Sequence, residues 1–105
     1  MTLPRRHSHP AALPALDYEI AQEQATALGR LGRALEAALT ALADHDRANG
    51  ARDAVRLRLV QDASDALWYF IVQREACGLR DPRPVVRDYR VPAEVYARMG
   101  AFGRR

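Results

Sequence analysis

One stretch of the chain decides which folds are open to it. Between residues 17 and 48, apolar residues recur every three or four positions, the period of an α-helix with one buried side. The apolar stripe consists of Ile20, Ala27, Leu28, Leu31, Leu35, Ala38, Leu39 and Leu42. Asn49-Gly50 then supplies the left-handed backbone position at which helices commonly end. The pattern predicts one helix over 17–48, well above the usual length of about 11 residues.

A second helix is expected from about Arg52 to Cys77, where Gly78 follows the last periodic residue. Its stripe is formed by Leu59, Val60, Ala63, Ala66, Leu67, Phe70, Ile71 and Cys77. Because the connection through Asn49-Gly50 is short, this helix should fold back antiparallel on the first. The sequence therefore predicts an all-α fold built on a long helical hairpin over residues 17–77.

The sequence ALWYFIV, residues 66–72, is apolar on every side of the second helix. Trp68, Tyr69 and Val72 project from the side that carries Arg58 and Asp65 one or two turns earlier. One side of this stretch can face the first helix, but the other side needs a different cover. Trp68, Tyr69 and Val72 are therefore predicted to lie beneath another part of the chain.

Two short helices are expected within residues 82–100. Pro82 and Pro92 stand where a helix can begin, and Gly100 stands where the second would end. Helices below about 12 residues are marginal in water by themselves, so these two must pack on the hairpin. We expect them to provide the cover for the apolar face of the second helix.

The prolines near the N-terminus, at positions 4, 10 and 14, predict a disordered or extended tail over residues 1–15. Residues 16–105 then form a single helical domain. His7 and His9 could hold a metal weakly, but the first sixteen residues contain no Cys, Asp or Glu to complete a site. No metal site is predicted there.

In a lone helical hairpin, part of each leucine stripe stays exposed to water. Hairpins commonly solve this by pairing into four-helix bundles, and two-fold dimers are the most frequent closed oligomers. The sequence therefore predicts a homodimer, with a four-helix bundle as its core.

Arg74 lies in the middle of the second helix's apolar stripe, one turn after Phe70. A buried guanidinium must be paired, and Glu23 and Gln24 are the polar interruptions of the opposite stripe. We expect Arg74 to meet Glu23 or Gln24, from the same chain or a dimer mate, as a structural ion pair. An anion-binding arginine in a pocket is the alternative.

The chain has no residue pattern typical of an enzyme. Asp44-His45-Asp46 holds residue types of a metal or base cluster, but adjacent helical positions diverge, so a solvated histidine at a helix end is expected. Cys77 would lie at a helix C-terminus, where the helix dipole disfavours a thiolate. The predictions are no enzymatic activity, no metal and no cofactor.

Composition gives only broad limits on location and partners. The net charge is +3, with basic and acidic residues interspersed, and the single cysteine excludes an internal disulfide. A membrane span needs about 20 apolar residues, far more than the longest apolar run, over 66–72. The sequence predicts a cytoplasmic protein with no membrane contact.

DNA binding is the alternative function. Residues 82–100 have the rhythm of a helix-turn-helix unit. Against it, the turn would need a small or left-handed residue where Arg90 stands, and Glu94 would bring a negative charge to the DNA. The sequence therefore argues against nucleic acid as a partner.

Tyr96, Arg98 and Phe102 form a predicted rim for an unidentified protein partner. Aromatic residues and arginine are enriched at the centres of protein interfaces. The alternative is that the aromatic side chains of this segment all face Trp68 and none is exposed.

The C-terminal third carries a resemblance. Its pattern, WYF-x-x-QREACGL followed by RDY-x-VP, resembles that of a family of short, mostly proteobacterial helical proteins of unknown function. The resemblance implies a compact C-terminal unit and no particular activity. The sequence thus predicts a small helical interaction or regulatory protein that acts as a homodimer.

Overall fold

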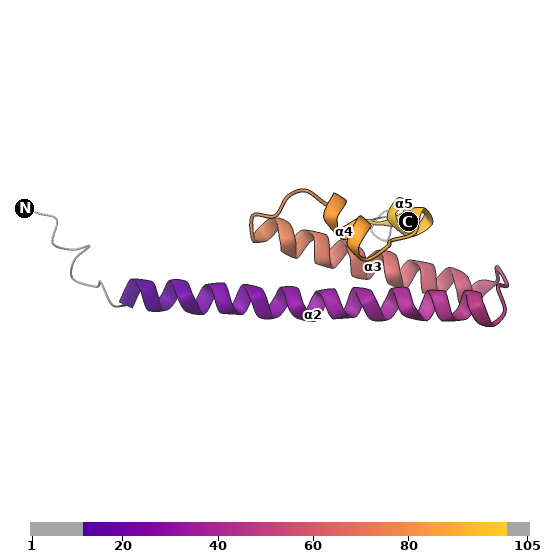
Figure 1. The fold of residues 1–105 in the computed structure, drawn as a ribbon, viewed down its shortest axis with the longest axis horizontal. Helices are drawn as coiled ribbons and strands as arrows, with labels where there is room; N and C mark the ends of the chain where they lie inside the picture. The colour runs from indigo at the N-terminus through magenta and orange to yellow at the C-terminus, as the bar shows by residue number, and fades with distance from the viewer. Residues whose placement is uncertain (1–11, 101–105) are drawn as a thin grey trace, which may run out of the picture.

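The computed structural model describes residues 12–100, which form helices and, within that range, no strand (Figure 1). The helices are α2 (Ala12–Ala48), α3 (Ala54–Ala76), α4 (Arg83–Asp88) and α5 (Ala93–Arg98). Both long helices and both short ones predicted from the sequence are present, so the all-α prediction is confirmed. None of the helices in this range is long and apolar enough to cross a membrane.

The first helix begins at Ala12 and not at residue 17. Pro14 falls in the first turn, where a backbone N–H has no partner within the helix and proline is tolerated. The predicted tail over 1–15 is therefore wrong for residues 12–15. The rest of that tail, residues 1–11, lies outside the described residues.

The turn between α2 and α3 is fixed by local polar contacts. Gly50 is left-handed with φ of 63°, and the Asn49 side-chain oxygen accepts the Ala51 N–H at 2.7 Å. Asp53 is the N-cap of α3, and its Oδ1 accepts the Arg56 N–H at 2.9 Å. The turn therefore starts α3 at a defined residue, which sets how the two helices align.

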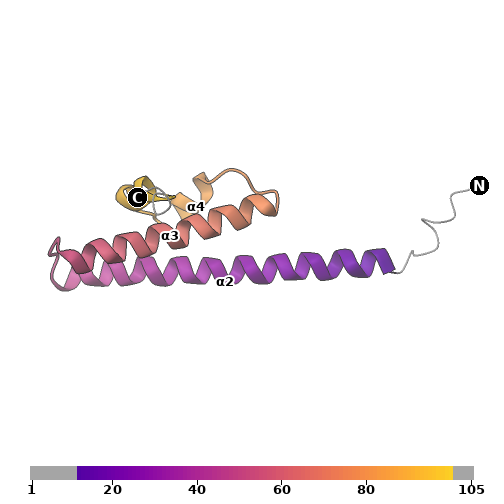
Figure 2. The same ribbon diagram turned by 180° about the vertical axis from the view of Figure 1, so that it is seen from behind.

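The alignment follows from two contacts across the hairpin. Asp46 pairs with Arg56 at 2.8 Å, and Gly32 lies beside the ring of Phe70. Each step back along α2 is thus matched by one step forward along α3, which brings the end of α3 level with Thr26. At 1.5 Å per residue, about 14 residues of α2, roughly 21 Å, extend past α3 (Figures 1 and 2). We call this segment, residues 12–25, the overhang.

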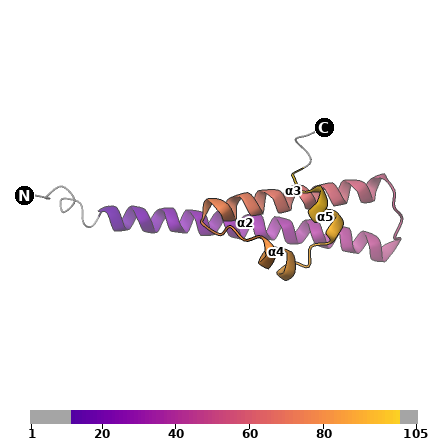
Figure 3. The same ribbon diagram turned by 90° about the horizontal axis from the view of Figure 1, so that it is seen from above.

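The two short helices pack on the hairpin, with α5 over α3 and α4 beside it (Figure 3). The Ser64 hydroxyl lies 2.9 Å from the carbonyl oxygen of Val95 and ties α5 to α3. Tyr89, after α4, meets Phe70 edge to face with ring centroids 5.5 Å apart. Its hydroxyl reaches α2, where a Cβ at Gly32 would lie 2.8 Å from it. The C-terminal helices therefore fill the groove between α2 and α3.

The predicted cover of the ALWYFIV stretch is only partly correct. Gly100 lies against the ring of Trp68, but Tyr69 and Val72 are 55% and 42% exposed. The short helices pack instead on the face that carries Ser64 and Leu67. Its small serine admits the α5 backbone, which the bulky face at Tyr69 and Val72 does not.

The core runs along the hairpin and into the C-terminal helices. Its buried apolar residues are Leu35, Leu42, Val60, Ala63, Leu67, Phe70, Ile71, Val85, Val91 and Val95. Residues from all four helices or their adjoining turns meet in one cluster. The described chain therefore behaves as one packed unit with a single projecting overhang.

Leu67→Ala should lower the free energy of unfolding by about 2–5 kcal/mol, because Leu67 is fully buried and truncation leaves a cavity. Leu57→Ala on the same helix is the matched control, since Leu57 is 55% exposed. Urea denaturation followed by circular dichroism measures both. Equal losses in the two variants would contradict this assignment of the core.

Candidate functional site

The most connected polar residue of the described chain is Arg56, in the first turn of α3. Its side chain is 10% exposed, and its guanidinium lies between carboxylates from two other helices. Nε and Nη2 donate to the Asp46 oxygens at 2.8 and 3.1 Å. Nη1 and Nη2 donate to the Glu94 oxygens at 3.0 and 2.7 Å. This arrangement joins α2, α3 and α5 through one side chain. We call Asp46, Arg56 and Glu94 the Arg56 cluster.

The charges of the Arg56 cluster stabilise one another. Hydrogen bonds from Arg56 lower the pKa of Asp46 and of Glu94 below their ordinary values, 3.8 and 4.5. The hydrogen bonds to Glu94, and next those to Asp46, raise the pKa of Arg56. Partial burial acts in the opposite direction on all three groups but is outweighed. The three residues are therefore all charged at neutral pH.

His45 is the buried neighbour of the Arg56 cluster. Its side chain is 10% exposed, and its ring nitrogens lie 3.6 Å from Asp46 Oδ1 and from Asp53 Oδ1. Neither nitrogen has a hydrogen-bond partner among the described residues. The prediction of a solvated histidine at the helix end is wrong, because the start of α3 folds over it.

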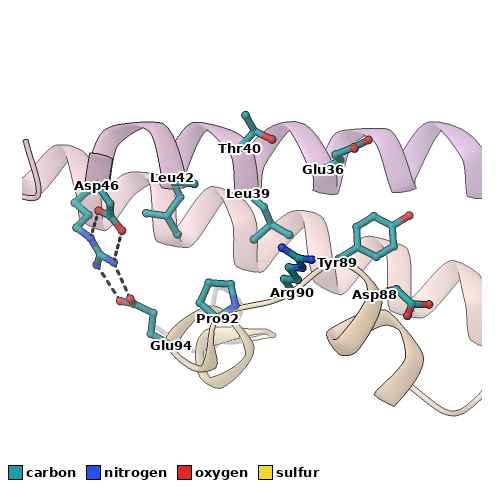
Figure 4. A pocket seen from close by; sticks show the side chains of 12 residues that line it. Glu36, Leu39, Thr40, Leu42, Asp46, Asp88, Tyr89, Arg90, Pro92 and Glu94 are labelled. Carbon is teal, nitrogen blue, oxygen red and sulfur yellow. Dashed lines mark hydrogen bonds and ion pairs between the residues drawn. The ribbon is translucent and has the colours of Figure 1, made fainter. Parts of the chain in front are cut away.

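A cleft of about 600 Å³ opens beside the Arg56 cluster, between α2 and the turn that joins α4 to α5 (Figure 4). Leu39, Leu42 and Pro92 supply apolar surface. Glu36 and Arg90 reach into it from opposite walls, and neither has an ion pair with any residue in the range 12–100. The cleft is thus part apolar, with one unpaired charge of each sign.

Arg90 has an unusual backbone for a residue with a side chain. The N–H of Val91 bonds to the carbonyl of Val86 at 3.0 Å and that of Arg90 to Arg87 at 3.3 Å, which is the Schellman ending of a helix. Arg90 occupies its left-handed position with φ of 53°. The same motif ends α3, where Gly78 holds that position. The backbone of Arg90 is therefore strained, at a position that glycine occupies in the turn after α3.

The predicted contact of Arg74 with Glu23 or Gln24 does not form within the described chain. By the hairpin register, Arg74 lies level with Leu28, about one turn from either residue. Its Nη2 instead donates to the carbonyl oxygen of Asp81 at 2.8 Å. Arg74 thus stabilises the loop between α3 and α4, and the structure gives it no part in a pocket.

The structure does not place the described residues of the predicted partner-binding rim, Tyr96 and Arg98, together on one exposed surface. Tyr96 is 42% exposed and lies on the surface, as expected for a rim. Arg98 is half-buried, and its Nη2 donates to the side-chain oxygen of Gln61 on α3 at 3.2 Å. Phe102 lies outside the described residues. Of the two rim residues that the structure describes, Tyr96 is the one placed where a partner could reach it.

Arg56 was missed by sequence reasoning, although the sequence contains a signal for it. Arg56 precedes Val60 by four residues and Ala63 by seven, so it lies on the buried stripe. The same argument singled out Arg74, at the other end of the stripe. Proximity to Glu94 could not be predicted, because it depends on where the C-terminal helices pack.

The polar groups of the described chain form no evident metal centre. No three His, Cys, Asp or Glu side chains in residues 12–100 are placed to share an ion. Asp46 and Asp53, the carboxylates nearest His45, accept hydrogen bonds from Arg56. The geometry of the Arg56 cluster is that of a structural junction.

One comparison with known proteins finds a family. The model of a family of unknown function, DUF6665, matches residues 5–105. The chain belongs to the DUF6665 family. The prediction of membership in an uncharacterised family is confirmed, while the proteobacterial source and the proposed signature stay predictions. No curated protein and no solved structure matches this DUF6665 chain.

The stability of this DUF6665 protein should fall as the pH drops, because Arg56 lowers the pKa of both Asp46 and Glu94. A carboxyl whose pKa is lowered by folding contributes stability above its unfolded pKa and loses it as the pH falls through its folded value. The free energy of unfolding should therefore decrease from pH 6 toward pH 3. Urea denaturation over this pH range measures it.

Arg56→Met should flatten this pH dependence, and Arg58→Met, an exposed arginine on the same helix, should leave it unchanged. Some dependence should persist in both variants, since Arg83 lowers the pKa of Asp81 to about 2. If Arg56→Met kept the full slope, the Arg56 cluster would not be its source.

Arg90→Gly should raise the free energy of unfolding by about 1 kcal/mol, because glycine adopts a left-handed backbone without strain. Gly78→Ala, at the equivalent position after α3, is the matched control and should lower stability by a similar amount. Thermal melts of both variants provide the measurement. A less stable Arg90→Gly variant would mean that the guanidinium stabilises the fold.

Proposed function

We propose that the protein is a small helical interaction or regulatory protein that acts as a homodimer in the cytoplasm. The observation that carries this proposal is the overhang. Leu16 and Ile20, one turn apart on the same side, are 53% and 57% exposed. Burying these two apolar side chains against a partner would remove them from water, which favours association.

The side of the overhang that carries Leu16 and Ile20 differs from the side that carries Tyr18, although both are exposed. Leu16 and Ile20 are separated by four residues, which aligns them on one side of the helix, whereas Tyr18 lies on the opposite side. A partner that covers Leu16 and Ile20 would therefore leave Tyr18 in contact with water. This gives the proposal an internal control.

The detailed form of the dimer predicted from the sequence, a four-helix bundle of two hairpins, has less support. The C-terminal helices occupy one side of the groove between α2 and α3, through Tyr89 and the α5 contact at Ser64. A second hairpin could pack only on the sides that remain. The overhang is the part of α2 on which a partner would meet no other helix.

The absence of enzymatic activity also stays a prediction. The charged side chains of the Arg56 cluster form hydrogen bonds with one another. The single cysteine in the sequence, Cys77, supports a reducing compartment, because it has no second cysteine to bond with.

DNA binding by the C-terminal helices is the weaker candidate. Arg90 does adopt the left-handed backbone that a tight turn requires. However, Glu94 and Arg98, the charged residues of α5, bond to Arg56 and Gln61 on α3. With only six residues, α5 offers little else to a DNA groove.

Ile20→Asp and Leu16→Asp should each convert the dimer to a monomer, because a carboxylate would be buried in the interface. Tyr18→Asp, on the opposite side of the overhang, should leave the dimer intact. Size-exclusion chromatography with light scattering gives the mass in each case. A wild-type protein that is monomeric at every concentration tested would refute the homodimer.

A further inference from the structure

Besides the overhang, the C-terminal helices α4 and α5 carry a second exposed surface. It is a groove of about 460 Å³ between α4 and α5, which we call the C-terminal groove. Its apolar lining is formed by Pro82, Val86, Val91, Ala93 and Tyr96, and its charged lining by Arg83 and Arg87. Both arginines are largely exposed, at 87% and 72% of their side chains. The groove therefore presents apolar surface with positive charge along its edge.

The overhang has the complementary pattern. Its charged residues are Asp17, Glu19 and Glu23, and it contains no basic residue. At 100° per residue, Glu19 and Glu23 lie to one side of the line through Leu16 and Ile20, and Asp17 lies to the other. The overhang is an apolar strip with acidic edges, the form in which amphipathic helices bind grooves.

We propose that the overhang of one copy binds in the C-terminal groove of a second copy, and that the overhang of the second copy binds in the groove of the first. Leu16 and Ile20 would pack on Val86 and Tyr96. The overhang's carboxylates would pair with Arg83 and Arg87. This inference rests on the proposed homodimer and names the surface that the overhang meets.

The exchange is compatible with a two-fold arrangement. The overhang extends past one end of α3, while α4 and α5 lie beside the paired part of the hairpin (Figures 1 and 2). Two molecules placed antiparallel, with the two-fold axis near the end of α3, bring each overhang alongside the other's C-terminal helices. Two-fold symmetry then uses the contact twice, which doubles the buried area.

The arginines of the groove can accept a further carboxylate. Arg87 donates from Nε to Asp88 at 2.9 Å, and its two Nη groups have no hydrogen bond to any residue in the range 12–100. Arg83 donates to Asp81 from Nε and Nη2, which leaves Nη1. Each guanidinium has five N–H donors, so both retain donors for the overhang.

Charge reversal tests the exchange. One variant carries Glu19→Arg and Glu23→Arg in the overhang, and the other carries Arg83→Glu and Arg87→Glu in the groove. Each variant alone should be monomeric, because its overhang and groove repel. Mixed in equal amounts, the two should form a heterodimer, since both contacts then join opposite charges. Native mass spectrometry distinguishes the heterodimer by mass.

Gln22→Arg is the control, because Gln22 lies on the side of the overhang away from Leu16 and Ile20. It should leave the wild-type dimer unchanged. Circular dichroism of both reversal variants should show wild-type helix content, which separates loss of the interface from loss of the fold.

The outcomes separate this inference from the proposed function. If the groove variant stays dimeric, the overhang binds another surface, and the exchange is refuted while the homodimer stands. If neither variant dimerises and the mixture stays monomeric with both chains folded, charge pairing between these surfaces is refuted. A wild-type protein that is monomeric throughout overturns both proposals.

Discussion

The guanidinium of Arg56 is the interaction on which the arrangement of the chain depends. It makes two hydrogen bonds to each of two carboxylates, one from the first helix and one from the last. Arginine is suited to this role because its planar group can face two carboxylates at once. The turn, the long hairpin and the C-terminal helices are thus connected at one point, close to where the hairpin closes.

The two short helices depend on such connections, since six residues form only one or two turns. The hydroxyl of Ser64 and the side chain of Gln61 hold α5 on α3. The ring of Tyr89, after α4, packs on Phe70 of α3, and its hydroxyl lies beside Gly32 of α2. Gly32 permits this last contact, because any side chain there would meet the Tyr89 hydroxyl. The C-terminal unit is therefore held by a few specific contacts around Val85, Val91 and Val95.

The helices and their order could be predicted from the sequence because they are local properties. Apolar period, proline positions and glycines after the last turn fixed both long helices to within a few residues, apart from the start of α2. The packing of α4 and α5 could not be predicted from the sequence. It depends on the small residues Gly32 and Ser64, which no periodicity in the sequence marks as contact points. The partner of Arg74 could not be predicted either, because the hairpin register places Arg74 about one turn from Glu23 and Gln24.

The unequal lengths of α2 and α3 give one continuous helix two different degrees of stability. Backbone amides of α2 beside α3 can exchange with solvent only when the hairpin opens, whereas those of the overhang are released by fraying from the helix end. Amide protection should therefore change near Thr26, within a helix whose geometry is uninterrupted. A partner that binds the overhang would have to suppress this fraying, which costs part of the binding free energy.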